Sequence, residues 1–109
     1  MRIAITPGAE APAITLHEAE DFKSFKVVTV PEVTGDDLSR ALRRLGRPTD
    51  DDHVFVSVEA IKTLAGSRAE NQDWQAGLQT MLAYAQSKGW TDTYGYVRAH
   101  IEPASQLEP

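Results

Sequence analysis

The chain has 109 residues, of which 41% are hydrophobic and 25% charged, a composition typical of one globular domain rather than of a disordered segment. Its formal net charge of −5 repels phosphate backbones and anionic membranes, so nucleic-acid binding would need a strong local basic patch. Because there is no cysteine, disulfides, thiol nucleophiles and thiolate metal ligands are excluded.

The start of the chain lacks the pattern of a signal peptide, because Pro7 and Gly8 interrupt its short apolar run. Nowhere do about 18 apolar residues follow one another, as a membrane span requires. We therefore expect a soluble, cytoplasmic protein with no membrane partner. We also expect a single domain over residues 1–109, made of a β-rich segment (1–33), a helical part with a hairpin (34–102) and a loose tail (103–109).

The first third of the chain predicts β-structure. Arg2–Thr6 and residues 13–16 are short apolar runs, and the acidic residues 18–21 that follow are typical of a loop. Residues 25–30, FKVVTV, are the best strand candidate, since they are rich in β-branched side chains and end at Pro31. Apolar residues on both faces of this run favour a central strand that is covered on each side.

A helical period follows, with Thr34 as a predicted N-cap and two acids in the first turn. Gly46 and Pro48 stop this helix. Its apolar positions stand at i, i+3, i+4 and i+7 and are Leu38, Ala41, Leu42 and Leu45. Its opposite side carries a cluster of arginines, Arg40, Arg43, Arg44 and, just beyond the helix, Arg47.

After a predicted loop at residues 48–52, His53–Val56 is a short strand candidate and Ser57 a predicted N-cap for a second helix that ends at Gly66. A third and longest helix is expected to begin near Asn71 or Gln72 and to end at Gly89, a left-handed C-cap. Its buried stripe is predicted to comprise Trp74, Leu78, Met81, Leu82 and Ala85.

The stretch 89–103, GWTDTYGYVRAHIEP, predicts a β-hairpin in which residues 89–91 and 96–102 flank a turn at residues 92–95. Side chains alternate along its second strand. The expected core side carries Val97, Ala99 and Ile101, and the polar side carries Tyr96, Arg98, His100 and Glu102.

Between residues 36 and 102 the predicted order is helix, short strand, helix, longer helix and hairpin, and LAYAQSKGWTDTYGYVRAHIE resembles the third helix and wing of a winged-helix domain. The resemblance implies a transcription regulator whose third helix enters the major groove and whose wing touches phosphates. However, Glu70 and Asp73 lie at the front of that helix, and residues 91–94 at the wing tip carry no positive charge. We therefore do not expect a nucleic-acid partner.

The sharpest catalytic candidate is the polar side of the last strand, where Arg98, His100 and Glu102 stand about 6.6 to 7 Å apart in succession. In this hypothesis His100 is the general acid or base, Glu102 or another carboxylate orients it, and Arg98 holds an anionic substrate or oxyanion. The alternative is an ordinary solvent-facing strand whose charges pair weakly with a neighbour.

Aromatic residues give a second set of candidates. Trp74 lies on the apolar stripe and is expected in the core, whereas Tyr84, Trp90 and Tyr96 are candidates for a ligand site or an interface. His17, His53 and His100 supply ligand types for a metal, but no spacing matches a metal motif and the run Asp50-Asp51-Asp52 lacks the glycine of a calcium loop. We expect no metal site and no cofactor.

Three classes of function stay open at this point. The first is a binding or accessory module that recognises a protein or a small molecule, because signatures of esterases, nucleotide hydrolases and dinucleotide-binding enzymes are absent. The second is a small acid–base enzyme, an isomerase, lyase or hydrolase, and the third is a winged-helix transcription regulator. Because a domain of this size buries a limited core, pairing with a second copy is a plausible way to bury additional surface.

Overall fold

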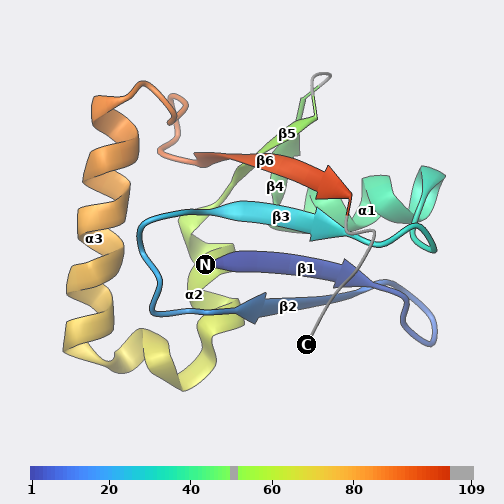
Figure 1. Ribbon diagram of the computed structural model, residues 1–109, viewed down its shortest axis with the longest axis horizontal. Helices are drawn as coiled ribbons and strands as arrows, with labels where there is room; N and C mark the ends of the chain where they lie inside the picture. The colour runs from blue at the N-terminus through green and yellow to red at the C-terminus, as the bar shows by residue number, and fades with distance from the viewer. Residues whose placement is uncertain (50–51, 104–109) are drawn as a thin grey trace.

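The computed structural model describes residues 1–49 and 52–103, so the predicted tail beyond residue 103 and part of the predicted loop 48–52 lie outside the described residues. Within them the fold is α+β, as predicted. Figure 1 shows helices grouped around a twisted sheet. In chain order the elements are β1 (Arg2–Thr6), β2 (Ala13–His17), β3 (Lys26–Thr29), α1 (Gly35–Leu45), β4 (Gly46–Pro48), β5 (His53–Val56), α2 (Val58–Ala65), the 3-10 helix η1 (Gly66–Glu70), α3 (Gln72–Ser87) and β6 (Val97–Pro103).

The described strands form one mixed sheet in the order β2-β1-β3-β6-β5-β4. Strands β1, β3 and β6 run parallel to one another, and the remaining neighbours are antiparallel. The last strand, β6, therefore lies between β3 and β5 and joins the N-terminal strands to the rest of the sheet (Figure 1). The β-rich first third is an integral part of this sheet.

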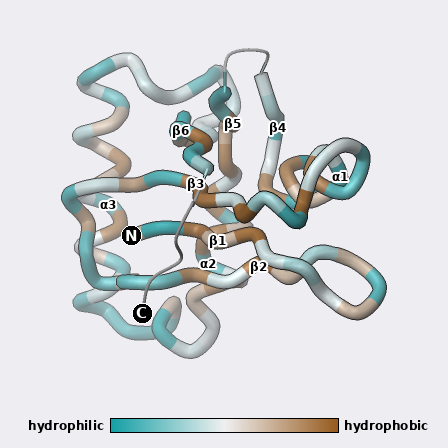
Figure 2. Tube along the Cα trace, turned by 45° about the vertical axis from the view of Figure 1, so that its right-hand side comes forward, coloured by the Kyte–Doolittle hydropathy of each residue, from teal (hydrophilic) through white to brown (hydrophobic). Residues whose placement is uncertain are grey.

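The hydrophobic core lies between one face of the sheet and the helices, and it follows the strand alternation. The apolar segments of β1 and β5 stand out along the chain trace in Figure 2. The sheet contributes Ile3, Ile5, Val27, Val54, Val56 and Ala99, and the helices contribute Ala41, Leu42, Leu45, Ile61, Ala65, Trp74, Leu78 and Met81. Among the described helices, none is both long enough and apolar enough to cross a membrane.

Local signals set the helix ends where the sequence predicts them. The Ser57 hydroxyl accepts a hydrogen bond from the Ala60 N–H at 3.0 Å, and the Asn71 side chain accepts one from the Trp74 N–H at 3.0 Å. Each satisfies one of the free donors of a first helical turn. Gly89 has a φ of 75°, which confirms the left-handed end of α3.

The last part of the chain departs from the predicted hairpin. Residues 89–91 form no strand, and a single bridge between Thr91 and Val97 stands in place of the ladder. Strand β5 pairs with residues 97–100 and β3 with residues 100–103, so a wing strand has only the short free edge at the start of β6, where the Arg98 N–H donates to the Trp90 carbonyl oxygen at 2.8 Å. The turn is held instead by Asp92, whose Oδ1 accepts the N–H groups of Tyr94 and Tyr96, both at 2.9 Å.

Strand β3 is interior, as predicted, and Val27 and Val28, on its two faces, are both buried. The helices pack on the Val27 side. The other face of the sheet carries the residues that alternate with the core set, and we call it the open face. Exposed side chains such as Thr15, Arg98 and His100 lie on it. Strand β4 was missed by the sequence analysis, because its three residues Gly46–Pro48 resemble a helix stop rather than a strand.

Strand β4 approaches β5 so closely that position 46 has no room for a side chain, and this can be tested by mutation. A Cβ atom at this position would lie 1.8 Å from the Phe55 carbonyl oxygen, so Gly46→Ala must displace backbone. We expect it to lower the free energy of unfolding by about 3 kcal/mol in urea denaturation. The control is Gly35→Ala, where φ is 60° and nothing lies within 4 Å of the added Cβ, and a loss of about 1 kcal/mol is expected. Equal losses in the two variants would contradict the steric argument.

Candidate functional site

The three residues of the predicted catalytic strand share the open face of β6, but they do not pair with one another as hypothesised. Arg98 and His100 are exposed, and Glu102 is half-buried. The Glu102 carboxylate binds the Lys26 ammonium on β3 at 3.2 Å. Each residue therefore meets neighbours on other strands, and the partner of Glu102 is a lysine rather than the imidazole of His100.

His100 instead faces another imidazole. His53 on β5 is its direct cross-strand partner in the antiparallel β5–β6 pair. The two ring centroids lie 5.1 Å apart, with an angle of 64° between the ring planes. Nothing in the sequence indicated this pair, because it depends on the pairing of β5 with β6.

Charge is distributed unevenly over the sheet. The described strands contain four basic residues and all three histidines of the chain, but a single carboxylate, Glu102. The registers place all of these side chains on the open face. We call the cationic and histidine residues the basic face, which comprises Arg2, His17, Lys26, Arg47, His53, Arg98 and His100.

Beside the basic face lies a cleft of about 460 Å³ between the end of α1 and the turn that precedes β6. We call it the arginine cleft. Its lining combines three cationic side chains with two aromatic phenols and is made by Arg43, Arg44, Leu45, Gly46, Arg47, Ser57, Tyr94 and Tyr96. The sequence predicts the arginines as one helix face, but no local pattern marks Tyr94 or indicates that the two segments meet.

Two of the cleft arginines are held in place by the protein. Arg44 donates to the Pro12 carbonyl oxygen at 3.0 Å. Arg47 binds the Asp92 carboxylate at 2.6 Å, and its guanidinium lies 4.8 Å from the centre of the Phe55 ring. A guanidinium has five N–H donors, so these contacts leave each arginine able to bind an anion.

Asp92 connects the cleft to the turn before β6. Burial raises the pKa of Asp92, but hydrogen bonds from Arg47 and from the backbone N–H groups of Tyr96 and Tyr94 outweigh it, so the pKa lies below its ordinary value of 3.8. The carboxylate is therefore ionised at neutral pH and holds both Arg47 and the turn that carries the two tyrosines.

The aromatic candidates divide between two places. Tyr84 and Trp90 are 55% and 37% exposed and contact each other edge to face, with ring centroids 5.9 Å apart. The ring centroids of Tyr96 and Tyr94 lie 6.2 Å apart, and both residues line the arginine cleft. The structure thus brings Tyr84 and Trp90 together and places Tyr96 at a different site.

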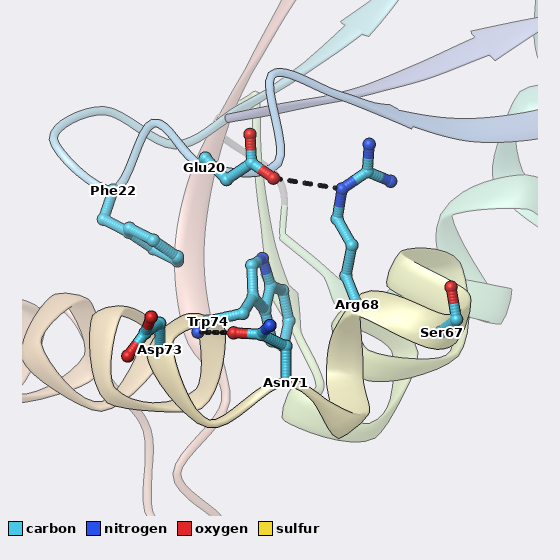
Figure 3. Close-up of a pocket in the computed structure, with 7 residues that line it drawn as sticks. All are labelled: Glu20, Phe22, Ser67, Arg68, Asn71, Asp73 and Trp74. Atoms are coloured by element: carbon cyan, nitrogen blue, oxygen red, sulfur yellow. Dashed lines mark hydrogen bonds and ion pairs between the residues drawn. The ribbon is translucent and has the colours of Figure 1, made fainter.

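A further hollow of about 500 Å³ lies where the loop after β2 crosses the start of α3 (Figure 3). An exposed ion pair at 3.3 Å between Glu20 and Arg68 spans it. Trp74 forms its base and is buried, as predicted, with its indole N–H donating to the Ala19 carbonyl oxygen at 2.9 Å. Phe22 lines both this hollow and a smaller one of about 350 Å³ that Tyr84 also lines. Because its cation and carboxylate already pair, this hollow presents less unpaired charge than the arginine cleft.

Within residues 1–49 and 52–103, no group of three or more histidine, aspartate or glutamate side chains lies close enough to hold a metal ion. The chain matches no protein-family model, no curated protein and no solved structure.

The role of Asp92 predicts a defined pH dependence. Because its pKa is lowered in the folded state, the ionised carboxylate stabilises the fold above pH 3.8, and this contribution is lost as the pH falls through the folded-state pKa. Asp92→Asn is expected to lower the free energy of unfolding at neutral pH, and its difference from wild type should shrink below about pH 3.8. Glu32→Gln, an exposed acid change elsewhere, serves as the control. A difference that stays constant down to about pH 2 would contradict this role.

Proposed function

We propose that the protein is a small binding module that recognises an anionic group, on a protein or on a small molecule, in the arginine cleft. The observation that supports this best is the convergence of Arg43, Arg44 and Arg47 with two tyrosines on one concave surface. Planar guanidinium groups bind carboxylates and phosphates through paired hydrogen bonds, and phenol hydroxyls add further donors.

The cleft is organised before a ligand arrives. Arg44 is anchored to the carbonyl of Pro12, Arg47 is fixed between Asp92 and the Phe55 ring, and the tyrosines stand on a turn that Asp92 holds. An anion entering the cleft would therefore meet donors whose conformational freedom is already reduced. Such preorganisation raises affinity because less entropy is lost on binding.

The charge distribution favours the same proposal. A chain of net charge −5 repels anions as a whole, yet Arg40, Arg43, Arg44 and Arg47 fall within eight residues, and the basic face adjoins them through Arg47. The local field can orient and attract an anionic ligand of limited size, while the acidic remainder of the surface disfavours a long polyanion. Nucleic-acid binding, which the winged-helix resemblance implies, therefore ranks below this proposal.

A matched pair of charge reversals tests the proposal. Arg43 lines the cleft, whereas Arg40, on the same helix, contacts Asp37 at the surface. Arg43→Glu and Arg40→Glu change the net charge equally, so a difference between them reports the cleft itself. With pyrophosphate and a short glutamate-rich peptide as probes in calorimetric titrations, we expect Arg43→Glu to weaken binding about tenfold or more and Arg40→Glu to have little effect.

Two results would contradict the proposal: no binding of either probe by the wild-type protein, or equal losses in both variants. A random-sequence DNA duplex at low salt, where electrostatic affinity is greatest, is the third probe. Tight duplex binding that Arg40→Glu and Arg43→Glu weaken alike would favour the transcription-regulator alternative over a cleft ligand.

A further inference from the structure

Outside the arginine cleft, the open face carries two histidines whose imidazole rings contact each other. His53 and His100 occupy directly opposed positions on neighbouring antiparallel strands, where side chains point to the same side of the sheet. His100 is exposed and His53 half-buried, so solvent reaches the pair from the open face.

From this geometry we propose that His53 and His100 form a two-histidine site for a divalent transition-metal ion such as Zn²⁺ or Ni²⁺. Imidazole nitrogens are preferred ligands of these ions. An ion held at about 2.0–2.1 Å from one nitrogen of each ring, with a ligand angle between 90° and tetrahedral, places the two ring centroids about 4.5 to 5.2 Å apart. The observed separation of 5.1 Å lies within this range, and the rings, now at 64° in an edge-to-face contact, reach the chelating arrangement by rotating about their side-chain torsions.

The backbone beneath the pair is fixed from two sides. The carbonyl of His53 accepts hydrogen bonds from the Thr49 N–H at 2.9 Å and from the Thr49 hydroxyl at 3.0 Å. On the other side, the Ile101 N–H donates to the Asp52 carbonyl at 2.8 Å and ties β6 to the start of β5. Because both strands are held at this level, binding a metal costs rotamer freedom of two side chains and little backbone order.

Among the residues that the structure describes, the charged neighbours on the open face permit a metal without completing a group of three ligands. Lys26 and Arg98 share the open face with the pair, and their repulsion of a cation is moderated by solvent screening and by the Glu102 carboxylate at Lys26. Two protein ligands leave the remaining coordination positions to water or to an incoming anion. Such a site would bind metal less tightly than a structural zinc centre.

The third histidine provides a matched control. His17 lies on the same face but at the far edge of the sheet, where its Nε2 contacts the Thr15 hydroxyl at 2.9 Å. Untagged wild-type protein should bind one equivalent of Zn²⁺ or Ni²⁺ by calorimetry. His53→Ala and His100→Ala should each weaken this binding about tenfold or more, because one imidazole loses the chelate advantage, and His17→Ala should leave it unchanged.

A second measurement separates ligation from a change in folding. On addition of Zn²⁺ to the wild-type protein, NMR signals of both His53 and His100 side chains should shift together, and acidification should reverse the effect because protons compete for the nitrogens. The proposal is overturned if the wild type binds neither ion, or if His17→Ala loses as much affinity as His100→Ala. Arg43→Glu should retain the metal affinity, so this test is independent of the arginine cleft.

Discussion

The insertion of β6 between β3 and β5 is the constraint on which the rest of the structure depends. Its parallel register with β3 and antiparallel register with β5 join the N-terminal strands to the strands that follow α1. Without it the sheet would divide into two parts, each exposing an unpaired edge and half of a hydrophobic face. Val97 and Ala99 of β6 are buried, and Ala99 belongs to the core cluster, so the last strand completes the sheet and the core together. The same insertion opposes His100 to His53 and brings the turn that carries Tyr94 and Tyr96 against the end of α1.

Much of this fold can be predicted from local signals. The alternation of Val97, Ala99 and Ile101 with polar residues, the cap at Ser57, the start of α3 at Gln72 and its glycine end all depend on residues close in sequence, and the structure confirms them. The predicted hairpin forms only in part. A turn at residues 92–95 does form, but β5 and β3 pair with most of the following strand and leave only its start beside residues 90 and 91. Propensity alone cannot show which partner a strand takes. Strand β4 escaped prediction for a similar reason, since Gly46 and Pro48 enter the sheet only because β5 lies beside them.

The candidate sites could be predicted only in part. The sequence placed Arg98, His100 and Glu102 on one side of a strand, because a period of two is a local property. It did not reveal that Lys26 would meet Glu102 or that His53 would meet His100, since both contacts join residues brought together by the sheet. The arginines of α1 were visible as a cluster, but their meaning changed when the turn before β6 supplied two tyrosines and an anchoring aspartate. Side-chain type is thus readable from sequence, whereas the composition of a concave site depends on topology.

The distribution of charge on the sheet bears on how this surface can associate. An open sheet face with apolar side chains would favour stacking with a second copy, but this face carries four cationic residues and three histidines against one carboxylate. If two copies associated through this face, like charges would be brought together and desolvated, and this carries a large free-energy cost. The exposed Tyr84–Trp90 pair lies outside the sheet strands and has the Lys88 ammonium beside it, 5.5 Å from the Tyr84 ring centroid, so self-association there would bring fewer like charges together. Self-association through Tyr84 and Trp90 would therefore leave the open face and the adjoining arginine cleft accessible, as the proposed anion binding requires.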